Sequence, residues 1–139
     1  MKKLLLDTNI VIDLLAKREP GYSSAAQIFS LGDKRQLQLG VSALTIANTN
    51  YLLLKLKSHD EVKSILRKFK LLVNVLPLED KVISLALNDK DFKDFEDGLQ
   101  YFTAIENSQD IIITRNLKDF KNSKIPVMTA DQFLKIYNE

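Results

Sequence analysis

Lys3-Leu4-Leu5-Leu6-Asp7-Thr8-Asn9-Ile10-Val11-Ile12-Asp13, residues 3–13, opens with a short apolar run that ends abruptly on a carboxylate. Three consecutive leucines bounded by polar residues indicate a strand that is buried on both faces. Asp7 would then lie at the carboxyl end of this strand, where open α/β sheets bind their ligands. Asp7 also suits the start of a helix, because aspartate caps helices well and apolar residues follow it. From this stretch alone, Asp7 is equally compatible with a role as a helix cap and with a role in a functional site.

The rest of the chain alternates between strand and helix patterns. Short apolar runs predict strands at residues 37–41, 73–77, 110–114 and 125–127, and apolar residues at helical spacing fill the intervals. In the helix after the second strand, one face carries Leu44, Ala47, Tyr51 and Leu54, with Asn48 elsewhere. Strands that alternate with helices indicate an α/β fold with a parallel sheet covered on both sides. No linker, repeat or low-complexity segment interrupts residues 1–139, so we expect a single domain.

Composition narrows the chemistry that the chain can perform. It has 139 residues, 45% of them hydrophobic, and a net charge of +2 that is too balanced to indicate a nucleic-acid binder by charge alone. There is no cysteine, and the one histidine, His59, follows Ser58 in a capping-box pattern that predicts an exposed helix start. A histidine-dependent triad and a zinc site of His and Cys are therefore disfavoured. The four scattered glycines fit no phosphate-binding loop, so carboxylates remain as the candidate functional groups.

The apolar run at the N-terminus is too short for a secretion signal or a membrane span. Asp7 interrupts it after three leucines. The absence of cysteine also fits an intracellular protein. We therefore expect a cytoplasmic protein.

The strand predicted at residues 110–114 repeats the pattern of the first strand. It switches at once to the polar segment 115–119, as the first strand does at Asp7. Parallel strands end at one edge of the sheet, so these carboxylates can approach within a few ångströms if the strands are neighbours, about 4.8 Å apart. A third acidic segment, residues 88–97, precedes a helix predicted from Gly98 to Asn107 and places Asp94 and Asp97 near its start. Such acids commonly cap a helix, and most charge runs are solvated.

Carboxylates crowded at one crevice repel one another and raise each other's pKa unless a cation neutralises them. Mg²⁺ or Mn²⁺, held by a few carboxylates and its own waters, is the natural occupant of an all-oxygen site. Such a metal lowers the pKa of bound water and stabilises charge on a phosphate oxygen. This chemistry indicates hydrolysis of a phosphodiester.

Four segments resemble, in order, the successive motifs of the PIN domain family. They are Leu5–Asn9, Val41–Ala47, Asp94–Tyr101 and Ile112–Phe120. The resemblance runs over nearly the whole chain and is closest to small VapC-like toxins of bacterial toxin–antitoxin pairs. It implies a three-layer α/β/α sandwich around a parallel sheet of about five strands. It also implies a Mg²⁺-dependent endoribonuclease.

The resemblance assigns site residues one by one. Asp7, Asp97 and Asp119 match the acids that bind the metal in the family, and they are expected to be catalytic. Thr114 matches a hydroxyl residue that supports the site. Asn48 stands where PIN nucleases usually carry a glutamate on the helix after the second strand, and it completes the expected catalytic set.

Three further residues are secondary candidates: Asn9, Asp94 and Asn116. Asn9 matches the polar residue that accompanies the first acid, and Asp94 lies one turn before Asp97. Many members have aspartate where Asn116 stands. Asparagine keeps an oxygen that can face a metal or its water, but it removes a charge and cannot act as a base. The two asparagines, Asn48 and Asn116, therefore predict weaker metal binding and support one metal ion better than two.

The expected partners are an RNA substrate, a protein antitoxin that blocks the crevice, and a second copy of the chain in a homodimer. A competing hypothesis is a PIN-like module that binds RNA or a protein without turnover, and Asn48 is its main support. A phosphoryl-transfer protein with Asp7 as nucleophile is a weaker one, because Asn9 stands where such proteins usually have a second aspartate. Arg115 and nearby lysines could grip phosphates, although exposed basic residues usually only solubilise a protein.

Overall fold

The computed structural model describes residues 1–139 and contains one sheet of five strands in the order β3-β2-β1-β4-β5. The strands are β1 (Lys3–Leu6), β2 (Gln38–Ser42), β3 (Asn74–Leu76), β4 (Ile111–Ile113) and β5 (Val127–Met128). Every neighbouring pair is parallel. The predicted α/β fold with a five-stranded parallel sheet is confirmed.

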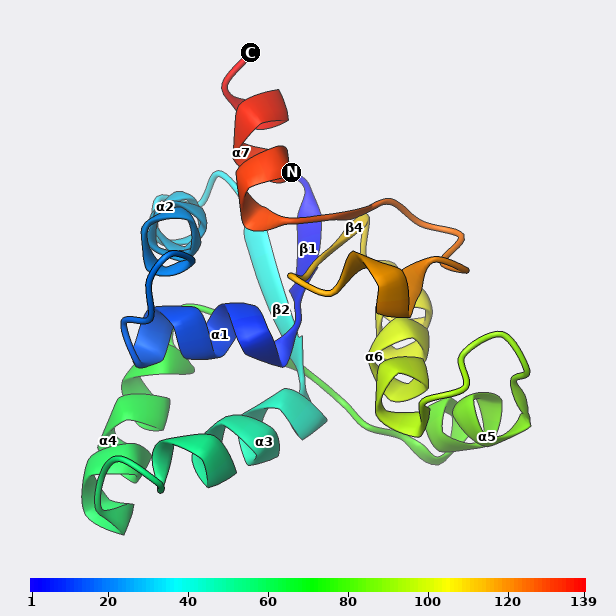
Figure 1. Cartoon of the computed structure of the whole chain (residues 1–139), viewed down its shortest axis with the longest axis horizontal. Coiled ribbons are helices and arrows are strands. Elements are labelled where there is room, and N and C mark those ends of the chain that lie inside the picture. The colour runs from blue at the N-terminus through cyan, green and yellow to red at the C-terminus, as the bar shows by residue number, and fades with distance from the viewer.

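Helices lie on both sides of this sheet (Figure 1). They are α1 (Thr8–Leu15), α2 (Tyr22–Asp33), α3 (Ala43–Leu53), α4 (His59–Phe69), α5 (Asp80–Asn88), α6 (Phe95–Glu106), the 3₁₀ helix η1 (Leu117–Phe120) and α7 (Ala130–Tyr137). The predicted capping box is present at the start of α4, where His59 is exposed. None of the helices combines the length and the apolar character that crossing a membrane requires.

Strand β1 explains why three leucines follow one another. Leu4 and Leu6 belong to the core that the sheet shares with α1, α2 and α7, whereas Leu5 packs with Tyr101 and Ala104 of α6 on the opposite face. All three leucines are completely buried. Side chains alternate between the two faces of a strand, so a strand covered on both sides is apolar throughout. Each buried leucine contributes about 1.5–3 kcal/mol to stability.

The strand order opens a crevice beside β1. From β1 the chain builds outward through β2 and β3, and it then returns to place β4 and β5 on the other side of β1. Ligands bind where the strand order reverses in this way, at the carboxyl ends of the strands. The register pairs Leu6 with Ile113, so Asp7 and Thr114 follow at the same edge. The two strands with polar ends are indeed neighbours.

Helix α3 does not bury the face that its apolar residues suggested. The helix buries Thr45, Thr49 and Leu53, whereas Ala47 is exposed and Tyr51 is 65% exposed. The physical reason is that Thr45 forms hydrogen bonds inside the protein, so the inward face of the helix can be polar. The outward face keeps Tyr51 at the rim of the crevice.

Helix α6 begins at Phe95, three residues before the predicted start at Gly98. Asp94 is the N-cap, and its Oδ1 accepts a hydrogen bond from the Asp97 backbone N at 3.0 Å. This capping bond satisfies a backbone donor in the first turn, which extends the helix toward the N-terminus. Asp97 therefore lies inside the helix, one turn after its cap.

Candidate functional site

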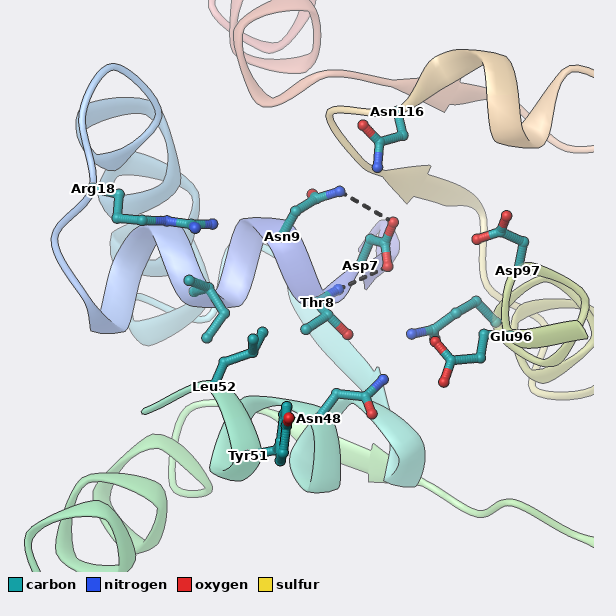
Figure 2. A pocket seen from close by; sticks show the side chains of 12 residues that line it. Asp7, Thr8, Asn9, Arg18, Asn48, Tyr51, Leu52, Glu96, Asp97 and Asn116 are labelled. Carbon is teal, nitrogen blue, oxygen red and sulfur yellow. Dashed lines mark hydrogen bonds between the residues drawn. The ribbon is translucent and has the colours of Figure 1, made fainter. Parts of the chain in front are cut away.

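A crevice of about 360 Å³ lies at the carboxyl ends of the central strands. Its polar side chains come from four separate segments and face one another across it (Figure 2). Those that bear on the chemistry are Asp7, Asn9, Asn48, Glu96, Asp97 and Asn116. The crevice thus combines residues from α1, α3, α6 and the loop after β4.

Asp7 is at once a helix cap and a member of the site. Its Oδ1 accepts a hydrogen bond from the Thr8 backbone N at 2.8 Å, which caps α1. Its Oδ2 accepts a hydrogen bond from the Thr114 hydroxyl at 2.8 Å and a longer one from the Asn9 amide at 3.4 Å. The two roles that the sequence left open are therefore not exclusive, because each uses a different carboxylate oxygen.

Burial raises the pKa of Asp7 above its ordinary value. The hydrogen bonds from Thr114 and Thr8 lower this pKa in part, the negative charge of Asp119 raises it further, and Arg115 lowers it. The ionised form of Asp7 is thus incompletely compensated by the groups around it. A cation in the crevice would supply the missing compensation.

Thr114 and Asn9 fix the Asp7 carboxylate in place. Thr114 is fully buried, and its hydroxyl also accepts a hydrogen bond from the Asn116 backbone N at 3.1 Å. The Asn9 amide nitrogen lies 3.3 Å from the Thr114 hydroxyl, and its Oδ1 accepts a hydrogen bond from the Arg115 backbone N at 3.2 Å. These contacts join the start of α1 to the loop after β4, as expected of residues that support a carboxylate ligand.

Asp97 is a second acid of the site whose pKa is raised. Its pKa rises to about 7, first because the carboxyl group is desolvated and then because Asp94, Asp119, Asp7 and Glu96 repel its charge. Carboxylates from three segments of the chain therefore act on Asp97 at once. This mutual repulsion is the electrostatic condition that a divalent cation relieves.

Asp119 and Asp94 lie beside the crevice rather than in it. Both are exposed and line a neighbouring hollow, also of about 360 Å³, that contains several lysines. Asp97 lines both cavities and joins them. The fold thus brings Asp7 and Asp97 into one crevice, and Asp119 is adjacent. No three Asp, Glu, His or Cys side chains are close enough together to form a complete metal cluster.

The donor atoms of the site suit a hard divalent cation. Carboxylate and amide oxygens line the crevice, and it has neither histidine nor cysteine. Mg²⁺ keeps several of its waters and is commonly bound through one or two carboxylates. A pair of carboxylates such as Asp7 and Asp97 is therefore compatible with Mg²⁺ even without a third direct acidic ligand.

Asn48 occupies the wall contributed by α3 and extends toward the crevice (Figure 2). Its side chain makes no hydrogen bond within the protein, so both its oxygen and its nitrogen are free to bind water or a ligand. It contributes no charge. The α3 side of the crevice is therefore neutral, and the negative charge lies on the α1 and α6 sides.

A buried hydroxyl network behind the crevice was missed by the sequence reasoning. The Thr45 hydroxyl lies 3.1 Å from the Thr8 hydroxyl and 3.3 Å from the Ser42 hydroxyl, and it accepts a hydrogen bond from Gln100 Nε2 at 2.8 Å. Gln100 lines the crevice, and its Oε1 is buried without a partner. Helical spacing offered a signal, because Gln100 lies three residues after Asp97 and Thr45 lies three before Asn48.

Glu96 was also missed, although it is next to Asp97 in the sequence. It is exposed, and its carboxylate faces the crevice from α6 (Figure 2). Three carboxylates therefore line the crevice even though α3 supplies none. The only signal was its place in the acidic segment, where most charges point to solvent.

We expect the metal-free protein to lose stability as the pH rises from about 4 to about 7. The pKa of Asp97 is about 7 in the folded protein against an ordinary value of 3.8, so the folded state binds the extra proton between these values. The stability that the folded protein gains from the proton on Asp97 is fully present below pH about 4 and is lost as the pH rises through about 7. Urea unfolding in EDTA across this range measures the effect.

Asp97→Asn should flatten this pH dependence, because the titrating carboxyl group is gone. Asp33→Asn is the matched control, since Asp33 is exposed on α2 and its side chain forms no hydrogen bond or ion pair. If the free energy of unfolding changes with pH equally in Asp97→Asn and in the unmodified protein, the prediction is contradicted.

Comparisons with known proteins identify relatives of the whole chain. The model of a family described as PIN domain matches residues 3–118. The chain is 28% identical to Ribonuclease VapC1 of Aquifex aeolicus (strain VF5), with 99% of this chain and 96% of that protein covered. The fold resembles a chain of a toxin–antitoxin complex from Klebsiella pneumoniae, with a TM-score of 0.69, 25% identity and coverage of 91% and 97%. It also resembles a chain of VapBC2 from Rickettsia felis bound to a DNA fragment from their promoter, with a TM-score of 0.67, 18% identity and coverage of 91% and 96%.

Proposed function

Because the chain belongs to the PIN domain family, we propose that it is a metal-dependent ribonuclease that hydrolyses RNA phosphodiester bonds. The observation that carries this proposal is the pairing of Asp7 and Asp97 across one crevice, with the pKa of both raised. Perturbed carboxylates in a polar crevice at the switch point of a parallel sheet are typical of a catalytic site. The likeness to a ribonuclease over almost the whole chain supports the choice of substrate.

Asp7, Asp97 and Asp119 are the residues that would hold Mg²⁺ or Mn²⁺, in part through waters of the ion. When bound, the ion lowers the pKa of an attacking water and stabilises the charge that develops on the phosphate. Thr114 and Asn9 hold Oδ2 of Asp7 in position through their hydrogen bonds. Asn48 and Asn116 line the crevice and would orient water or the phosphate through their amide groups.

Asp94 has a different role in this proposal. It caps α6 through the Asp97 backbone N and so places Asp97 at the crevice. Its charge also raises the pKa of Asp97. Asp94 would therefore act through Asp97 and not as a direct ligand.

We further propose that the protein is the toxin of a toxin–antitoxin pair and that residues 1–139 act as one domain. The resemblance to chains solved in a toxin–antitoxin complex and in VapBC2 supports a protein antitoxin as partner. Such a partner would block the crevice, and a homodimer of this chain is expected beside it. An RNA substrate would place the activity in the cytoplasm.

The alternative is a PIN-like module that binds RNA or a protein partner without turnover. The neutral side chain of Asn48 on the α3 wall favours it. The same crevice would then be a binding site in which the remaining carboxylates are too few for catalysis.

A cleavage assay with controlled metal content tests the proposed function. We expect the purified protein to cut RNA in Mg²⁺ or Mn²⁺, to stop in EDTA, and to resume when the metal is restored. Cleavage that continues in EDTA would contradict metal dependence. RNA binding without cleavage in any of these conditions would favour the alternative.

A further inference from the structure

Asp13 is a buried carboxylate that the proposed reaction does not use. It lies on α1 with only 1% of its surface exposed. Arg18 contacts its Oδ1 through Nη2 at 3.2 Å and donates a hydrogen bond to it from Nε at 3.3 Å. Arg115 Nε lies 3.2 Å from the other oxygen, Oδ2. A buried carboxylate thus pairs with two arginines from distant segments, and buried charges persist only when they are paired.

The turn between α1 and α2 is built around this carboxylate. A Cβ atom added to Gly21 would collide with the Asp13 side chain. Gly21 has a negative φ of −80°, so its backbone does not require glycine, and the close approach to Asp13 does. The chain therefore leaves space for a charged group where an apolar residue would fill the core.

One of the two arginines, Arg18, lines the crevice, and the other, Arg115, lines a second hollow together with Asp13 and Asp131. The side chain of Arg18 extends toward Asn9 (Figure 2). Arg115 follows Thr114, donates its backbone N–H to Asn9, and is close enough to lower the pKa of Asp7. Each arginine side chain is 47% exposed, whereas that of Asp13 is 2% exposed. The carboxylate is the internal anchor, and the guanidinium groups keep free N–H donors on the solvent side.

We propose that Asp13 is a positioning residue that holds Arg18 and Arg115 as a subsite for a phosphate of the RNA backbone next to the reacting bond. The inference rests on the proposed function. The guanidinium group of Arg18 lines the crevice beside the acidic end formed by Asp7 and Asp97, and that of Arg115 is paired with the same buried carboxylate from the second hollow. A guanidinium group presents five N–H donors in a planar fork that matches phosphate oxygens. A strand of RNA would thus meet the arginines with one phosphate and the carboxylates with the next.

The effect of Asp13→Asn on RNA affinity distinguishes a positioning role of Asp13 from a simple effect of its charge, because the two predict changes in opposite directions. Removing a negative charge should by itself tighten the binding of a polyanion. Loss of positioning should instead weaken binding by about tenfold, the value of one charge-assisted hydrogen bond. It should also make log Kd less dependent on log salt, because the slope falls by about 0.7 for each phosphate of a single strand that the protein no longer neutralises.

The measurement is fluorescence anisotropy with a short fluorescein-labelled single-stranded RNA in EDTA, between about 50 and 200 mM NaCl. Asp33→Asn is the control, because it makes the same charge change on an exposed carboxylate that has no arginine partner. Arg18→Lys is a second variant, safe for folding because the side chain is half exposed. It keeps the charge but loses the fork, and it should weaken binding to a similar extent.

The subsite would be supported by weaker binding and a smaller salt slope in Asp13→Asn, by weaker binding in Arg18→Lys, and by unchanged or slightly tighter binding in Asp33→Asn. If Asp13→Asn fails to fold, the result for Arg18→Lys decides alone. Unchanged or tighter binding in folded variants of a protein that still cleaves RNA would overturn the subsite and leave the proposed function standing. An unmodified protein that neither binds nor cleaves RNA would overturn both.

Discussion

Asp7→Asn is expected to reduce the rate of RNA cleavage by at least about a hundredfold. Mutating a residue that only hydrogen-bonds a metal ligand typically costs up to about a hundredfold in activity, and loss of the ligand itself should cost at least as much. Asp7 lies at the centre of the site, at the end of β1 and between the α3 and α6 walls. Its Oδ2 is held by Thr114 and Asn9, so it is the carboxylate with the most fixed geometry. Asparagine offers a single oxygen without charge and binds a divalent cation poorly.

The same substitution should increase thermal stability at pH 7 in EDTA. Burial raises the pKa of Asp7, so holding this group ionised at neutral pH opposes folding, and the neutral amide removes that penalty. Asparagine is also as good an N-cap as aspartate, so α1 keeps its start. Loss of activity together with a gain in stability is the signature of a functional residue under electrostatic strain.

Single-turnover cleavage in Mg²⁺ and thermal melting in EDTA test the two halves of this prediction on one preparation. Asp33→Asn again serves as the control and should change neither quantity. Cleavage at the full rate in Asp7→Asn would remove Asp7 from the catalytic set. A lower melting temperature would show that the hydrogen bonds to the carboxylate matter more than its burial.

Asn48→Glu is expected to increase affinity for Mg²⁺ by about tenfold or more. A unit charge pair separated by 4 Å is worth about 1 kcal/mol in water and about 4 kcal/mol near a protein surface, and a factor of ten corresponds to 1.4 kcal/mol. Asn48 faces the crevice with no hydrogen-bond partner, so a glutamate there would not break an existing contact. Its charge would restore the acid that the PIN resemblance places on α3. If the chain is a weakened nuclease, cleavage should rise as well.

The added charge should have an opposite effect on the metal-free protein. It would repel Asp7, Asp97 and Glu96, which already line the crevice, and so lower stability at pH 7 in EDTA. Ala47→Glu is the matched control, because Ala47 is exposed on the same helix and lies outside the crevice. Calorimetric titration with Mg²⁺ measures the affinity of each variant. Equal affinities for Asn48→Glu and the unmodified protein would indicate that Asn48 does not face the metal.

The sequence determined the features that depend on neighbouring residues. The leucines of β1 predicted a strand buried on both faces, and Asp7 marked its end, because strand burial and helix capping are read within a few residues. The capping box predicted at Ser58 is present for the same reason. The family motifs then selected Asn48, which lies on the crevice wall.

The tertiary structure decided which distant residues meet. Sequence patterns could not fix the strand order that makes β1 and β4 neighbours, and this order brings Asp7 and Thr114 together. They also could not show that Asp119 lines a separate hollow while Glu96 faces the crevice, because the direction of a side chain depends on how its helix is rotated against the sheet.

The pairing of Asp13 with two arginines is also decided by the tertiary structure alone. Arg18 and Arg115 are nearly a hundred residues apart in the chain, and no local pattern relates them. Only the packing of α1 beside the loop after β4 places both guanidinium groups on one buried carboxylate. Local propensity thus specified the elements and the end of each strand, whereas the charges that share the crevice were set by long-range packing, on which periodicity and capping carry no information.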